Sequence, residues 1–77
     1  MPHVVVKLYQ GRSDQQKLQL AEQIVKDVTA ICHCGEESVS VAIEDVNPGD
    51  WTEKVYKADI VPNWKNLYKK PGYNPLE

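Results

Sequence analysis

Two stretches of the chain alternate between apolar and other side chains, the pattern of a strand with one buried face. The first covers about residues 3–9 and the second about residues 38–46, and both are rich in β-branched residues, which favour extended backbone. The apolar residues that share one face are Val4, Val6 and Leu8 in the first stretch, and Val39, Val41 and Ile43 in the second. The sequence therefore predicts two strands.

Between these strands, apolar residues recur at spacings of three and four, which is typical of an amphipathic helix. They are Leu18, Ala21, Val25, Val28 and Cys32. Ser13 and Gln16 have the spacing of a capping box at a helix start, and Gly35 is a natural C-terminal stop. We predict a helix over about residues 14–33.

The order strand, helix, strand predicts a right-handed βαβ unit with parallel strands, in the α/β (α+β) class. Further helices are expected toward the C-terminus. A capping box formed by Asp50 and Glu53 favours one over about residues 51–58, and Pro62 suits the first turn of another over about 62–70. We expect one domain over residues 1–77, with a loose tail at residues 74–77.

The short chain of 77 residues cannot build a large core, so it needs a supplement to its stability. A disulfide is a poor candidate because Cys32 and Cys34 are one residue apart and would close almost no loop. A two-stranded sheet is also rarely stable alone, and its outer edges are open. We therefore expect an obligate oligomer in which two units pair into a four-stranded sheet.

Charge and hydropathy exclude several classes of function. Eleven acidic residues against nine basic ones give a net charge of −2, which lacks the basic footprint of a nucleic-acid-binding protein. No apolar run approaches the roughly 20 residues of a membrane span. No basic start followed by an apolar run marks a signal peptide, so we expect a cytoplasmic protein with no membrane or nucleic-acid partner.

Pro2 is the first residue with candidate chemistry. Its small size permits removal of the initiator Met1, which would expose a secondary amine at the start of a strand. An α-amino group titrates near 8, and burial or a nearby cation lowers that value. A base poised near neutrality suits proton abstraction next to a carbonyl. Proline at this position also occurs for processing reasons alone.

Arg12, the only arginine, follows the first predicted strand in a loop. Its fork of donors suits bidentate capture of a carboxylate. The alternative is an exposed loop arginine that pairs loosely with Asp14.

Three segments together resemble the 4-oxalocrotonate tautomerase family. They are Met1-Pro2-His3, the loop sequence Gly11-Arg12-Ser13-Asp14, and Ser38-Val39-Ser40-Val41-Ala42-Ile43 in the second strand. Residues 51–73 are similar to a longer bacterial subgroup, the phenylenolpyruvate-type tautomerases, which form dimers rather than hexamers.

The resemblance implies roles for four residues. Pro2, freed of methionine, matches the general base that moves a proton between an enol oxygen and carbon. Arg12 matches the arginine that binds the substrate carboxylate, often across a subunit boundary. Trp51 matches an aromatic wall beside the proline, although it can equally be a core or interface anchor. Ser40 occupies the position of a second arginine found in many members, where it can pack in the strand or donate a hydrogen bond to substrate.

With only one arginine, a monoacid with an apolar or aromatic tail is a better substrate than a dicarboxylate. We therefore predict a cofactor-free keto-enol tautomerase that acts as a homodimer on a small enol acid such as phenylenolpyruvate or a 2-hydroxydienoate. Two alternatives stay open: a hydratase or dehalogenase of small unsaturated acids, and a non-catalytic oligomeric binding protein. A metal site formed by His3, Cys32, His33 and Cys34 is disfavoured, because the cysteine spacing gives poor tetrahedral geometry.

Overall fold

The computed structural model describes residues 1–77 and separates into two compact units. The first unit is Met1–Asp45 and the second is Val46–Glu77. Each unit is described below by itself. No helix in either unit is long and apolar enough to cross a membrane.

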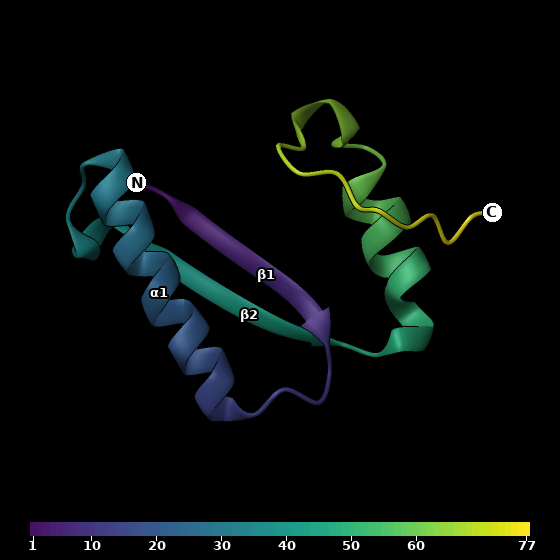
Figure 1. Ribbon diagram of the computed structural model, residues 1–77, viewed down its shortest axis with the longest axis horizontal. Coiled ribbons are helices and arrows are strands. Elements are labelled where there is room, and N and C mark those ends of the chain that lie inside the picture. The colour runs from purple at the N-terminus through teal and green to yellow at the C-terminus, as the bar shows by residue number, and fades with distance from the viewer. The chain divides into compact units, whose positions relative to one another are not determined.

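The first unit is a βαβ motif, as predicted. Strand β1 spans His3–Tyr9, helix α1 spans Asp14–Cys32, and strand β2 spans Ser40–Val46, after a 3₁₀ turn at Glu36–Ser38. The two strands are neighbours in one sheet and run parallel, with both arrows ending on the same side in Figure 1. Helix α1 makes the crossover that parallel strands require and lies alongside them.

The start of α1 is fixed by local hydrogen bonds. The Ser13 hydroxyl accepts from the Gln16 amide at 3.1 Å, and the Gln16 side-chain carbonyl accepts from the Ser13 amide at 2.9 Å. The predicted capping box is therefore confirmed, and two of the helix's orphan donors are satisfied.

The end of α1 differs from the prediction in the residue that stops it. His33, not Gly35, takes the left-handed conformation, with φ 56° and ψ 50°. Gly35 is extended, with φ −78°, and its carbonyl accepts from the Ser38 hydroxyl at 2.8 Å. Glycine is the usual residue in a left-handed helix cap, but other residues also take this conformation, and here His33 does.

The first unit has no closed core of its own. Val4, Val6 and Leu8 of β1 are half-buried, whereas Val5 and Tyr9 on the opposite face are 45% and 51% exposed. The only buried apolar residues of the chain, Val55 and Tyr56, belong to the second unit. The sheet face that carries Val5 and Tyr9 therefore leaves apolar surface in contact with water.

The second unit is built around a π-helix, Thr52–Ile60, which follows a 3₁₀ turn at Pro48–Asp50. The Val61 amide donates to the Tyr56 carbonyl at 2.9 Å, the five-residue spacing of a π-helix. Val55 and Tyr56 supply its buried face, at 5% and 4% exposure.

The capping box predicted for Asp50 and Glu53 is absent. Instead, Asn47 caps the 3₁₀ turn by accepting from the Gly49 amide at 2.9 Å. Asp50 and Glu53 accept from lysines four residues later, Lys54 at 3.4 Å and Lys57 at 2.8 Å. Acidic residues near a helix start can serve such pairs as readily as a cap.

The helix predicted over residues 62–70 is reduced to one 3₁₀ turn, Trp64–Asn66. A helix of that length is marginal in water unless an apolar face packs on something. Trp64 is 40% exposed and Tyr68 is wholly exposed, so the expected apolar edge is not covered. Residues 74–77 form a turn in which the Leu76 amide donates to the Asn74 side chain at 2.9 Å.

Candidate active site

Pro2 lies immediately before β1, where its carbonyl accepts a hydrogen bond from the Ser40 amide at 3.2 Å. Parallel pairing thus places the start of β2 beside the N-terminus, and Pro2 and Ser40 are neighbours. Pro2 is half-buried, but Met1 is wholly exposed. While Met1 is attached the Pro2 nitrogen is an amide without basicity, and removal of Met1 would disrupt no packing.

The Ser40 side chain is paired with His3. Nδ1 of His3 and Oγ of Ser40 lie 2.6 Å apart, and both residues are exposed. They share the sheet face that carries Val5, since strand side chains alternate. A polar pair therefore lies at the start of β1. The sequence did not predict that His3 and Ser40 contact each other.

Arg12 lies at the other end of β1, in the loop that leads into α1. It is exposed and lines a hollow of about 220 Å³ whose other lining residues are Leu8, Gln16, Lys17 and Leu20. Two cationic side chains thus border a hollow with two leucines, which suits a carboxylate attached to an apolar body.

One copy of the chain does not bring Pro2 and Arg12 together. Strand β1 has seven residues, and at about 3.3 Å per residue its ends are roughly 20 Å apart. Figure 1 shows the N-terminus at one end of β1 and the loop into α1 at the other. Of the residues predicted to form the site in this unit, Pro2 and Ser40 meet and Arg12 is remote from both.

Trp51 belongs to the second unit, where it directly precedes the π-helix. It is partly exposed, and its indole N–H donates to the Tyr73 hydroxyl at 3.0 Å. The C-terminal segment therefore contacts this side chain and limits its movement.

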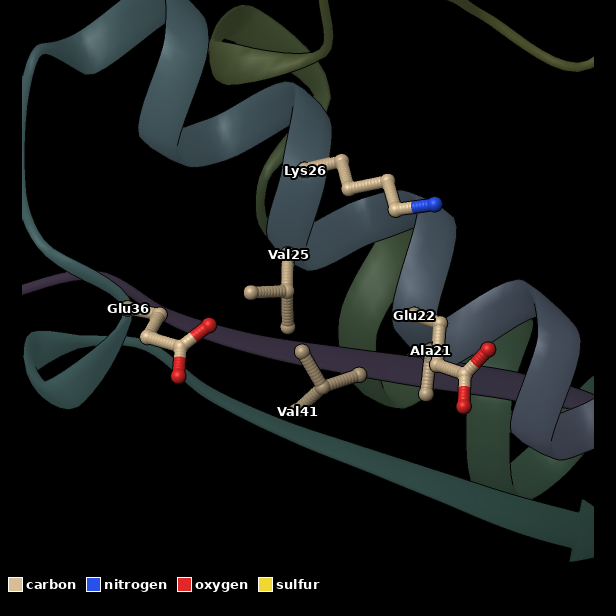
Figure 2. A pocket seen from close by; sticks show the side chains of 6 residues that line it. All are labelled: Ala21, Glu22, Val25, Lys26, Glu36 and Val41. Carbon is tan, nitrogen blue, oxygen red and sulfur yellow. The ribbon is translucent and has the colours of Figure 1, made fainter.

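A second hollow in the first unit, of about 400 Å³, lies between α1 and β2 (Figure 2). Val25 and Val41 point toward each other across it, and the charged side chains of Glu22, Lys26 and Glu36 stand around them. Two carboxylates disfavour an acidic ligand here, and none of the predicted site residues lines this hollow.

The cysteines and histidines do not assemble into a metal centre. No group of three or more His, Cys, Asp or Glu side chains is placed to hold a metal ion, and Cys32 and Cys34 are free thiols.

Comparison with known proteins assigns the family. A family model described as "Tautomerase enzyme" matches residues 2–55, more than half of the chain, and this range includes Pro2, Arg12, Ser40 and Trp51. The chain belongs to the tautomerase family. It is accordingly an isomerase, and the βαβ unit and the family resemblance inferred from its sequence are confirmed.

Two relatives match the sequence of this tautomerase over almost its whole length, and a solved structure matches part of it. A "Probable tautomerase" of Xylella fastidiosa is 40% identical over 99% of this chain and 93% of its own length. "Tautomerase PptA" of Cronobacter sakazakii is 36% identical over 95% of this chain and 97% of its own. The crystal structure of YwhB, titled a homologue of 4-oxalocrotonate tautomerase, matches with a TM-score of 0.58 and 37% identity, over 60% of this chain and 75% of that one.

Sequence reasoning missed Lys17 as a neighbour of Arg12. Its ammonium forms an ion pair with Asp45 of β2 at 2.7 Å, and only 22% of its side chain is exposed. Lys17 directly follows Gln16 of the capping box, in the first turn of α1. This position in the sequence could have predicted that it lines the same hollow as Arg12. Lys17 ties the helix start, and with it the arginine loop, to the sheet of the tautomerase.

The loop that carries Arg12 depends on Gly11. Its backbone has a φ of +117°, which residues with a side chain rarely adopt. An added Cβ would nevertheless meet no atom within 4 Å. Gly11→Ala is therefore expected to cost about 1–3 kcal/mol of stability through backbone strain alone. Urea unfolding at fixed protein concentration measures this cost, and Gly72→Ala is the matched control. Gly72 has equal space and no positive φ, so equal midpoints for the two variants would contradict the strain.

Proposed function

We propose that this tautomerase catalyses cofactor-free keto-enol conversion of a small enol acid, such as phenylenolpyruvate or a 2-hydroxydienoate, with Pro2 as general base. The observation that carries the proposal is the position of Pro2. It is half-buried at the start of β1 beside Ser40, behind a Met1 that is wholly exposed and free to be removed.

In the proposed mechanism the neutral amine of Pro2 takes the proton from the 2-hydroxyl group of the enol acid. The O–H electron pair forms the carbonyl, the enol double bond shifts its electrons to the adjacent carbon, and that carbon receives a proton from the Pro2 ammonium. The substrate gains and loses one proton, so no cofactor or metal is required. General base catalysis of this kind is typically worth a factor of about 10² to 10⁴.

Arg12 binds the substrate carboxylate in this proposal. Because Arg12 lies roughly 20 Å from Pro2 along β1, the arginine that serves one Pro2 comes from another copy of the chain. Its hollow, lined by Leu8 and Leu20, supplies apolar contact next to the guanidinium. Trp51 forms an apolar wall that excludes water from the amine.

The substrate is proposed to be a monoacid with an apolar or aromatic tail. Ser40 stands where a second arginine would clamp a dicarboxylate, and its hydroxyl is already paired with His3. A charge-assisted hydrogen bond contributes roughly 1.5–3 kcal/mol, so a dicarboxylate would lack a sizeable part of its binding energy. In this proposal the Ser40 hydroxyl can still donate one hydrogen bond to a 2-oxygen of the substrate.

Self-association as a homodimer is part of the proposal. The first unit has no fully buried residue, and its outer sheet face exposes Val5 and Tyr9. A second copy that pairs with the sheet would cover such apolar surface and one of its open edges.

We also place the protein in the cytoplasm, where a reducing environment keeps Cys32 and Cys34 as thiols.

The proposal is tested with purified protein whose loss of Met1 has first been verified by intact-mass measurement. Phenylenolpyruvate is added, and decay of the enol absorbance is followed against the buffer rate. We expect strong acceleration with processed protein. If the decay is not accelerated, phenylenolpyruvate is not a substrate of this tautomerase. Retention of Met1 would favour a non-catalytic binding protein.

The same preparation tests the hydratase or dehalogenase alternative. A haloacrylate is added, and released halide is measured. We expect none, because Arg12 is the only arginine of the chain and no further arginine is available to polarise the unsaturated acid for attack by water. Halide release at a rate comparable to tautomerisation would overturn the present choice of reaction.

A further inference from the structure

The C-terminal segment reaches back to Trp51 through a hydrogen bond. The indole N–H of Trp51 donates to the Tyr73 hydroxyl at 3.0 Å, across 22 positions of sequence. Indole has only this one polar group, and its ring plane is set by two side-chain torsions. A partner at the N–H therefore restricts how far the ring can swing.

Tyr73 is itself held by a buried residue of the π-helix. Its ring centroid lies 5.8 Å from that of Tyr56, with the planes tilted by 49°, an arrangement that aromatic pairs favour. Tyr56 is only 4% exposed, whereas Tyr73 is 47% exposed. The buried Tyr56 thus anchors Tyr73, and Tyr73 in turn anchors Trp51.

This chain of contacts joins the family region to the extension beyond it. Trp51 and the start of the π-helix lie within residues 2–55, which the family model matches, but Tyr73 lies outside that range. A part of the chain that the family pattern does not include therefore helps to orient a residue proposed to line the site.

We propose that Tyr73 is a positioning residue that fixes the plane of the Trp51 indole and so favours substrates with a planar aromatic tail. This inference rests on the proposed function, in which Trp51 is the apolar wall of the site. Stacking between rings depends on their relative plane, whereas contact with a flexible aliphatic tail does not. A wall that is already fixed also avoids the entropy cost of ordering a loose side chain when the substrate binds.

The test is Tyr73→Phe, which removes the hydroxyl and keeps the ring that packs on Tyr56. Tyr68→Phe is the matched control, because Tyr68 is wholly exposed. The kcat/KM values for phenylenolpyruvate and for an aliphatic 2-hydroxydienoate are measured for both variants. We expect the aromatic-to-aliphatic ratio to fall about fivefold in Tyr73→Phe, through KM, a factor that corresponds to about 1 kcal/mol for one neutral hydrogen bond. The ratio should be unchanged in Tyr68→Phe.

An independent readout is the exchange rate of the Trp51 indole proton with solvent, followed by NMR in a Trp64→Phe background. Loss of the acceptor should speed this exchange in Tyr73→Phe only.

Equal losses of kcat/KM on both substrates would indicate a general structural role and overturn the inference. An active wild-type protein whose ratio and exchange rate are insensitive to Tyr73→Phe would overturn it while leaving the proposed function intact. An inactive wild-type protein would overturn both.

Discussion

Replacing Pro2 with alanine is expected to lower the rate of enol-to-keto conversion of phenylenolpyruvate by roughly tenfold or more. Removal of Met1 from this variant still leaves an α-amino group, but a primary one on a chain free to rotate. The proline ring fixes the direction of the nitrogen relative to β1 and supplies a secondary amine. The loss should appear in kcat, because the base acts on the reacting proton rather than in ground-state binding.

A sharper variant keeps the proline and changes only its nitrogen. Insertion of one alanine between Met1 and Pro2 leaves the Pro2 side chain in place but converts its nitrogen to an amide, which has no basic lone pair. We expect a loss of about 10² or more. Pro75→Ala, in the exposed C-terminal turn, is the matched control. Circular dichroism should be unchanged throughout, and turnover equal to wild type in the insertion variant would exclude Pro2 as the base.

Replacing Arg12 with alanine is expected to lower kcat/KM by about ten- to a hundredfold, the effect of losing charge-assisted hydrogen bonds of roughly 1.5–3 kcal/mol. Arg12→Lys should recover only part of the loss, since lysine keeps the charge but not the two-pronged donor geometry. Arg12 is exposed and makes no part of the buried packing, so neither change should affect folding.

Co-expression of Pro2→Ala and Arg12→Ala chains, each with its own tag, tests where the arginine comes from. If each site takes Pro2 from one copy and Arg12 from another, random pairing at equal amounts leaves about a quarter of the sites intact. The unfractionated mixture should therefore regain about a quarter of wild-type activity, and the mixed dimer about half, because one of its two sites is intact. Tandem purification by both tags isolates the mixed assembly, and its failure to recover activity would contradict a shared site.

The βαβ unit could be predicted from sequence because its signals are local. Alternation in the two strands, the apolar stripe of α1 and the Ser13–Gln16 capping box each act within a few residues. The errors lie where tertiary contacts decide. The local sequence does not indicate that helix α1 ends at His33. It also does not indicate that the segment after Pro62 lacks a surface against which a helix could pack.

The candidate site shows the same division. The proximity of Pro2 and Ser40 follows from parallel strand register, and the remoteness of Arg12 follows from the length of β1, so both were open to deduction once the strands were placed. The His3–Ser40 pair requires knowing which residues of the two strands face each other. The Tyr73–Trp51 bond joins residues far apart in sequence, and no periodicity signals it.

The seven residues of β1 have a consequence for how activity depends on the amount of protein. On the proposed arrangement, a lone chain carries the base at one end of a rigid strand and the anion-binding arginine at the other, so it holds two half-sites and no complete one. The fraction of complete sites, and with it the turnover per chain, then depends on the protein concentration. Dilution below the dissociation constant of the assembly therefore abolishes turnover with every residue chemically unaltered, because association creates the enzyme as well as stabilising it.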